Sequence, residues 1–264
     1  MKEDLPASPA DDRWRQMLTL PSPHLRRRRL HRHIPSAPRC KLCAVPFEGP
    51  GGLVFRFFGH RRWPKNPKYC EGCFRMLRGN HGGAEIECSL LFADVRGSTT
   101  LAEGMSPRDF NRLMGRFYDV AVETLVGHDA FVDKFVGDEI IGIFVPAMAG
   151  ELHSARAIEA AMELMRSTGH SQSSDPWVPI GAGVHTGMAY VGSIGQGSDT
   201  ELTAMGDVVN TTARLASAAR AGEVVVTNAA AQHARMPTEG REHRSLPLRG
   251  KSERTDVIVL SVSP

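Results

Sequence analysis

Residues 92–100 read FADVRGSTT, and the residues immediately before them are largely apolar. An apolar run of this length predicts a buried strand, which we expect at 86–95. Asp94 then lies at the end of the strand, before a turn whose amide groups can face a phosphate. A lone Asp in such a place is more often a turn cap than a ligand, so its role depends on what the rest of the chain supplies.

Two further polar stretches follow. Residues 133–138 read DKFVGD, which predicts a tight hairpin that ends in a second carboxylate, Asp138. Residues 206–214 read GDVVNTTAR and lead into an expected helix. Asn210 and Arg214 are four residues apart on this helix and therefore share one face.

The order of the expected elements is strand, helix, strand, strand, helix, strand, which is the split ferredoxin-like order. Ser106 and Asp109 resemble a capping box at the first helix, and Pro107 suits its first turn. The expected bounds are 86–95, 106–126, 130–136, 139–145, 151–167 and 178–191, followed by 208–219, 223–227, 244–248 and 256–262. We therefore predict an α+β domain over residues 85–264 with a central, mainly antiparallel sheet.

These stretches, together with GVHTG at 183–187 and LRGK at 248–251, resemble the class III adenylate/guanylate cyclase family. The resemblance implies conversion of a nucleoside triphosphate to a 3′,5′-cyclic nucleotide and pyrophosphate. It assigns two Mg²⁺ or Mn²⁺ ions to Asp94 and Asp138, helped by the backbone carbonyl of Val95. Such hard ions prefer oxygen ligands, and two of them can activate the attacking ribose hydroxyl and neutralise the triphosphate.

The resemblance also assigns the groups that bind the substrate's ribose and phosphates. Arg214 matches the arginine that stabilises charge on the α-phosphate, and Asn210 matches the asparagine that positions the ribose. Lys251, or alternatively Arg249, matches the contact to the terminal phosphate. An exposed basic residue at a strand end is otherwise usually a solvated one.

Two positions bear on the choice of base. A lysine suits N1 of adenine and a hydroxyl oxygen suits its N6 amino group, and in the family's pattern these places fall on Lys134 and Thr203. A guanylate cyclase tends to carry Glu at the first place. We therefore predict ATP as the substrate, and a guanylate cyclase is the alternative.

The family's active site lies between two catalytic domains, so one chain with the full set implies a two-fold homodimer with two equivalent sites. Two positions depart from the family's usual pattern: Ser98, where Phe is frequent, and His128, where Gly is frequent. Neither supplies a ligand. We expect these differences to alter packing or regulation and to leave activity in place.

Four of the five cysteines form two C-x-x-C pairs, Cys40 with Cys43 and Cys70 with Cys73. Four thiolates can enclose Zn²⁺ tetrahedrally, and such a closed site is structural. An iron–sulfur cluster uses the same ligands and stays open as an alternative. We predict a small metal-binding, zinc-ribbon-like module over residues 39–78 and a flexible linker over 79–84.

The charge of the chain is unevenly distributed. Residues 1–83 hold 17 Lys and Arg against 6 Asp and Glu, and the remainder holds 15 against 23. A basic run at 24–33 (HLRRRRLHRH) lies in residues 1–38, which we expect to form a solvated, flexible leader. Nucleic acid, an anionic membrane surface or an acidic protein are alternative partners for it. A nucleotide- or nucleic-acid-binding regulator without catalysis is the corresponding alternative function.

The chain has no apolar run of about 18 residues, so we expect no transmembrane helix. The first residues lack the continuous apolar segment of a signal peptide. Paired cysteines without a secretory signal favour metal binding over disulfides. The expected location is the cytoplasm.

Overall fold

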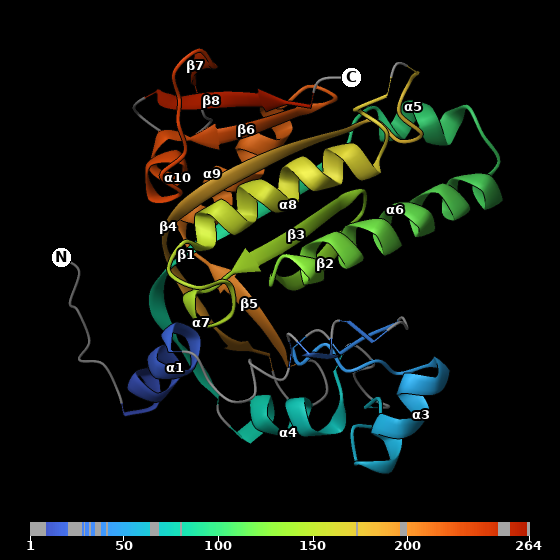
Figure 1. Ribbon diagram of the computed structural model, residues 1–264, viewed down its shortest axis with the longest axis vertical. Coiled ribbons are helices and arrows are strands. Elements are labelled where there is room, and N and C mark those ends of the chain that lie inside the picture. Colours follow the sequence, from blue (N-terminus) through green and yellow to red (C-terminus); the bar gives the residue numbers. More distant parts are fainter. Residues whose placement is uncertain are drawn as a thin grey trace.

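The computed structural model describes residues 9–20, 28, 30–31, 33–34, 38–40, 42–63, 69–79, 81–172, 174–195, 200–247 and 254–262. Its centre is an eight-stranded sheet in the order β2-β3-β1-β4-β6-β8-β7, and β5 pairs with β4 (Figure 1). The strands described are β1 (Gly82–Val95), β2 (Phe131–Val136), β3 (Glu139–Phe144), β4 (Ile180–Ile194), β5 (Glu201–Met205), β6 (Glu223–Thr227), β7 (Glu242–Leu246) and β8 (Thr255–Ser261).

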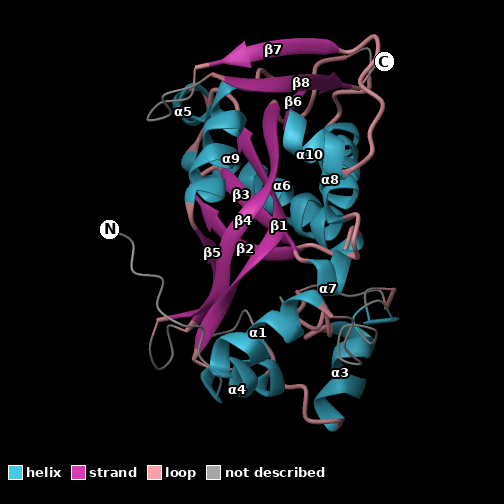
Figure 2. Ribbon diagram, turned by 90° about the vertical axis from the view of Figure 1, so that its left-hand side faces the viewer, coloured by secondary structure: helices cyan, strands magenta, loops and turns pink. Residues whose placement is uncertain are grey.

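Helices cover both faces of the sheet. Those described are α1 (Pro9–Thr19), α3 (Gly49–Phe57), α4 (Glu71–Gly79), α5 (Ser98–Glu103), α6 (Pro107–Gly127), α7 (Pro146–Ala149), α8 (His153–Ser167), α9 (Asp207–Ala218) and α10 (Asn228–His233). Figure 2 shows α9 on one side of the sheet and α8 with α10 on the other. β4 and β6 run parallel and the other described strand pairs run antiparallel, which confirms the predicted α+β class.

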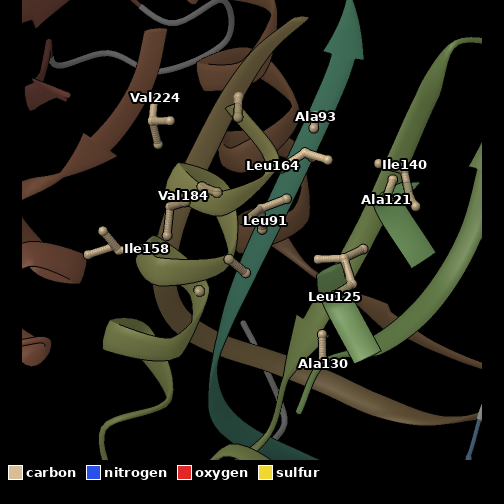
Figure 3. Close-up of a cluster of buried hydrophobic side chains, with 14 of the residues drawn as sticks. Leu91, Ala93, Ala121, Leu125, Ala130, Ile140, Ile158, Leu164, Val184 and Val224 are labelled. Atoms are coloured by element: carbon tan, nitrogen blue, oxygen red, sulfur yellow. The ribbon is translucent and has the colours of Figure 1, made fainter. Parts of the chain in front are cut away.

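The first long helix begins as the sequence predicts. The Ser106 hydroxyl accepts a hydrogen bond from the Asp109 N–H (3.2 Å) and donates one to the Asp109 carboxylate (2.6 Å). Pro107 occupies the first turn, where the missing N–H costs nothing. The buried face of α6 carries Met114, Phe117, Thr124 and Val126, with Ala121 and Leu125 drawn in Figure 3.

β1 is buried on both faces, as its apolar sequence predicts. Leu91 and Ala93 belong to a core shared with α6 and α8 (Figure 3). The alternate residues, Leu90 and Phe92 among them, belong to a second core shared with α9 and the N-terminal segment. Successive side chains of a strand point to opposite faces, so β1 separates the two cores.

The N-terminal segment differs from the flexible leader that we predicted over 1–38. Residues 9–19 form α1, and Trp14 packs against β1 with 2 % of its surface exposed. The Arg28 guanidinium is buried and donates hydrogen bonds to the carbonyl groups of Leu42 (2.8 Å) and Ala130. The physical reason is that one face of the sheet is apolar, and the segment covers it. The other residues of the basic run 24–33 that are described are Leu30, His31 and His33.

The predicted linker at 79–84 also differs from the structure, because β1 begins at Gly82. Gly83 faces Gly192 across the ladder, and a Cβ on Gly83 would lie 2.7 Å from the Gly192 Cα. These glycines permit a close approach of β1 and β4. From the sequence alone we had expected a flexible linker at 79–84. The elements that were not predicted are β5, α1, α3, α4, α5, α7 and α10.

None of the described helices is both long enough and apolar enough to cross a bilayer.

Candidate active site

The end of β1 brings together two of the predicted ligands. Asp94 pairs with Glu139 of β3 across the ladder, and the Val95 N–H donates a hydrogen bond to the Asp138 carbonyl (3.2 Å). Gly137 has φ +61°, a conformation that glycine adopts without strain and that closes the β2–β3 turn. The hairpin thereby places Asp138 beside Asp94, as the sequence predicts.

Two carboxyl groups at this end of the sheet, those of Asp94 and Glu139, have raised pKa values. Burial raises the pKa of Asp94 to about 6, and the charge of Asp138 adds to the effect. Burial also raises the pKa of Glu139 to about 7, together with the charges of Asp94 and Asp138. Asp94 Oδ1 is buried and has no hydrogen-bond partner in the described structure. Such a cluster favours a cation.

Arg96 is the counter-ion that the structure supplies. Its guanidinium forms an ion pair with Asp94 Oδ2 and donates hydrogen bonds to the carbonyl groups of Ser217 (3.2 Å) and Ala219 (3.4 Å). Arg96 thereby links the carboxylates to the C-terminal end of α9. Sequence reasoning missed both Arg96 and Glu139. The available signals were an arginine two residues after Asp94 and a carboxylate directly after the Gly137-Asp138 turn.

α9 turns Asn210 and Arg214 away from the sheet. Its buried face carries Val208, Thr211, Thr212, Leu215 and Ala216. Asn210 is exposed and Arg214 is half-buried, and neither side chain has a hydrogen bond or ion pair with another described residue. The helix lies close to β4 because Gly183 has no side chain: a Cβ there would lie 2.5 Å from the Ala216 nitrogen. The predicted pair therefore shares one outward face.

Thr203 lies at the other end of the β1–β4 ladder from Asp94. It pairs with Gly192, which pairs with Gly83, whereas Asp94 pairs with Gly181. The Thr203 hydroxyl donates a hydrogen bond to the carboxylate of Asp133 in β2 (2.7 Å).

Lys134 follows Asp133 in β2, and its side chain lies outside the described part of the structure. Arg249 and Lys251 also lie outside the described residues. The structure therefore brings Asp94 and Asp138 together, and Asn210 and Arg214 together. It places Thr203 apart from Asp94 and Asp138.

The profile of the adenylate and guanylate cyclase catalytic domain matches residues 84–261, which is more than half of the chain. The chain belongs to this family. Cyclase activity on a nucleotide is the family's chemistry.

Adenylate cyclases of other organisms are similar to about half of this chain. Adenylate cyclase 1 of Rhizobium meliloti (strain 1021) is 32 % identical over an alignment of 146 positions that covers 52 % of this chain and 22 % of the relative. The terminal-differentiation-specific adenylate cyclase of Dictyostelium discoideum is 33 % identical over an alignment of 132 positions that covers 48 % of this chain and 6 % of the relative. The chain thus spans less than a quarter of the length of either relative.

Solved structures with the same fold include guanylyl cyclases and adenylyl cyclases. The guanylyl cyclase Cya2 superposes with a TM-score of 0.62 at 23 % identity, covering 69 % of this chain and 100 % of that one. The adenylyl cyclase CyaB from P. aeruginosa gives 0.58 at 22 % identity, covering 67 % and 95 %. At these identities the superpositions establish the fold.

The four paired cysteines of the chain lie close together in space. The sulfur atoms of Cys40, Cys43, Cys70 and Cys73 all lie within 4.8 Å of one another. The Cys70 N–H donates a hydrogen bond to Cys40 Sγ (3.2 Å), and His60 Nδ1 lies 3.7 Å from Cys70 Sγ. The structure therefore brings the four candidate ligands together, and their binding of a metal stays a prediction.

The cysteine cluster is joined to the cyclase fold by Tyr69. This side chain is 1 % exposed, and its oxygen accepts a hydrogen bond from the Leu202 N–H (3.3 Å). Leu202 immediately precedes Thr203 in β5. The residue before the second cysteine pair therefore contacts the strand that carries a predicted base-selecting residue.

Proposed function

We propose that the chain is an adenylate cyclase, which converts ATP to 3′,5′-cyclic AMP and pyrophosphate. The observation that carries the proposal is the placement of Asp94 beside Asp138 at the end of β1, with the Val95 N–H bound to the Asp138 carbonyl. Family membership supports the cyclisation. Because the similar structures include adenylyl and guanylyl cyclases, the choice of ATP rests on individual side chains.

The carboxylates fit two Mg²⁺ or Mn²⁺ ions. Asp94 and Asp138 would hold them, helped by the Val95 carbonyl, because hard divalent ions prefer oxygen ligands. The buried Asp94 Oδ1 has no partner among the described residues and is suited to a cation. When bound, the ions supply Lewis acidity to the ribose hydroxyl and neutralise the triphosphate.

The orientation of α9 supports a site shared between two chains. Asn210 and Arg214 face outward, and Thr203 lies at the far end of the ladder from Asp94. A two-fold homodimer would bring the α9 face of one chain to the carboxylates of the other and form two equivalent sites. In each site Asn210 would orient the ribose, and Arg214 would stabilise negative charge on the α-phosphate.

The groups near Thr203 favour adenine. The Thr203 O–H is directed to Asp133, so the hydroxyl oxygen presents its lone pairs to a donor such as the N6 amino group. A lysine donates to the adenine N1 acceptor, which suits Lys134 on the neighbouring position of β2. Lys251, or Arg249, is our proposed contact to the terminal phosphate.

The cysteine cluster supports a structural metal in the N-terminal module. Four thiols within 4.8 Å of one another match the donor set of a closed zinc site. An iron–sulfur cluster has the same donor set, and visible absorption of anaerobically purified protein separates the two. Through Tyr69 and Leu202 the module would influence β5 and hence the base-binding region.

A side-by-side assay with Mn²⁺ and either ATP or GTP tests the proposed substrate. We expect cyclic AMP from ATP at a higher kcat/KM than cyclic GMP from GTP. The Lys134→Glu variant should move the ATP:GTP ratio of kcat/KM toward GTP by about 10–100-fold, because the wrong base leaves buried polar groups unpaired. A wild-type preference for GTP would favour the guanylate cyclase alternative, and absence of both products would favour the non-catalytic regulator.

A further inference from the structure

A second cluster of potential ligands lies on the face of β1 opposite to Asp94. Glu87 of β1, His153 at the start of α8 and His233 at the end of α10 place their ligand atoms within 4.8 Å of one another. His233 Nε2 lies 3.8 Å from Glu87 Oε2, and the two imidazole centroids are 4.3 Å apart. Three segments distant in sequence therefore meet at one point.

The two histidines are held by serine hydroxyls. His153 Nδ1 lies 2.8 Å from Ser89 Oγ, and His233 Nδ1 lies 2.8 Å from Ser154 Oγ. Each serine oxygen can accept a hydrogen bond from the Nδ1–H, which leaves the Nε2 lone pair available to a metal. Outer hydrogen bonds of this kind orient metal-binding histidines and fix their tautomer.

The surroundings combine burial with a route to solvent. His153 is 2 % exposed, and Ser89 and Ser154 are fully buried. Ser89 also shares a hydrogen bond with Thr186 of β4 (2.7 Å). The Glu87 side chain, in contrast, is 56 % exposed, and the side chain of His233 is 24 % exposed. An ion could therefore enter past the carboxylate and meet a rigid pair of imidazoles.

We propose that Glu87, His153 and His233 bind a divalent transition-metal ion, with Zn²⁺ the best match. Two imidazoles and one carboxylate are a zinc donor set that leaves one coordination position for water. Zinc–ligand bonds of about 2.0–2.2 Å place neighbouring ligand atoms roughly 3.4 Å apart, so only a small closure of the cluster is required. The ion would connect β1 to α8 and α10, behind the strand that carries Asp94.

Zinc titration of the 264-residue chain tests the proposal. The metal already held by the cysteines is first measured by elemental analysis, and excess Mg²⁺ is added to occupy the catalytic carboxylates. Calorimetry should then detect one more zinc equivalent in the wild type than in His233→Ala. The exposed Glu87→Gln change, which leaves the buried network intact, should also weaken this binding by at least about tenfold. Ser154→Ala, which keeps all three ligands, should weaken it by about 10–100-fold.

His243→Ala is the matched control, because it removes an exposed histidine of β7 and should leave the titration unchanged. X-ray absorption of the added zinc should show nitrogen and oxygen neighbours at about 2.0–2.1 Å and no sulfur shell near about 2.3 Å. Equal zinc binding by wild type and the Glu87 and His233 variants would overturn the proposal. A sulfur shell for the added ion would also overturn it.

Discussion

The two faces of β1 differ in how many of their buried polar atoms have hydrogen-bond partners. Toward α9, Asp94 Oδ1 and Arg96 Nε are buried without hydrogen-bond partners in the described structure. Toward α8, Ser89 bonds both His153 and Thr186. Buried polar atoms are normally paired, so the first face is incomplete without a ligand. The second face is already ordered and can accept an ion without large rearrangement.

The largest effect should come from the incomplete face. Asp94→Asn removes the charge that we propose to bind a metal ion and changes the side-chain volume little. We expect kcat to fall by about 10³-fold, because Lewis-acid stabilisation is worth several kcal/mol and about 1.4 kcal/mol corresponds to a factor of ten. The exposed Glu85→Gln change on the same strand is the control. Near-wild-type turnover of Asp94→Asn, measured with Mn²⁺ and ATP, would contradict the metal assignment.

Complementation between two inactive variants should show that Asn210 and Arg214 of each site come from a second chain. Asp94→Asn and Arg214→Ala are each expected to be inactive as homodimers. In a heterodimer one site carries both defects and the other carries neither. With random pairing about half of the dimers are mixed, so roughly a quarter of wild-type activity should return.

The heterodimers are isolated through two different affinity tags, and homodimers of each variant carrying the same tags provide the baseline. Recovery of activity would place the carboxylates and α9 of one site on different chains. If tagged heterodimers stay inactive although each variant is folded, the site is built within one chain or the roles are misassigned.

A smaller effect is expected from the close packing of α9 against Gly183 of β4. Gly183→Ala would place a Cβ 2.5 Å from the Ala216 nitrogen and 2.7 Å from the Leu215 Cβ. We expect the free energy of unfolding to fall by about 1–3 kcal/mol, the usual cost of overpacking. Gly115→Ala in α6 meets no atom within 4 Å and should instead stabilise by about 0.5–1 kcal/mol. Urea unfolding of both variants measures these changes in stability. Equal midpoints would contradict the close contact between Gly183 and Ala216.

The smallest predicted effect lies at the end of the sheet, away from both faces of β1. Arg244 forms two hydrogen bonds with the Glu223 carboxylate, at 2.9 and 2.7 Å, and lowers the pKa of Glu223. A carboxyl whose pKa is lowered by folding stabilises the native state above its unfolded pKa of 4.5, and the contribution is lost as the pH falls below that value.

Glu223→Gln should therefore lower the free energy of unfolding at pH 7 by about 1 kcal/mol and reduce the loss of stability between pH 4.5 and more acidic pH. Glu239→Gln, at an exposed position outside this ion pair, is the control. Parallel pH profiles of wild type and Glu223→Gln in chemical denaturation would contradict the assignment.

Much of the fold follows from local sequence. Ser106 and the periodic face of α6 predict that helix, and the apolar run before Asp94 predicts β1. The short β5 was missed because it forms by pairing with β4, and such tertiary pairing has little local signal. α1 was missed for a similar reason: Trp14 is ordered by the sheet that it covers.

The candidate site could likewise be predicted from the sequence only in part. Asp94 and Asp138 could be predicted because each lies in a recognisable stretch. Glu139 becomes part of the cluster only through its register opposite Asp94. His153 and His233 belong to helices that are distant in sequence, and their meeting depends on how these helices pack on β1. No local pattern contains that information.

The second core sets a limit on how this chain can be divided into fragments. The family match begins at residue 84, inside β1, and the core on that side also contains Trp14, Tyr69 and Phe74. A fragment cut at the family boundary would lose these aromatic side chains and expose the apolar strand face that they cover. We expect such a fragment to aggregate during production. We therefore expect the N-terminal segment to keep the family domain soluble by covering this strand face. Weak activity of a trimmed fragment would say little about the activity of the 264-residue chain.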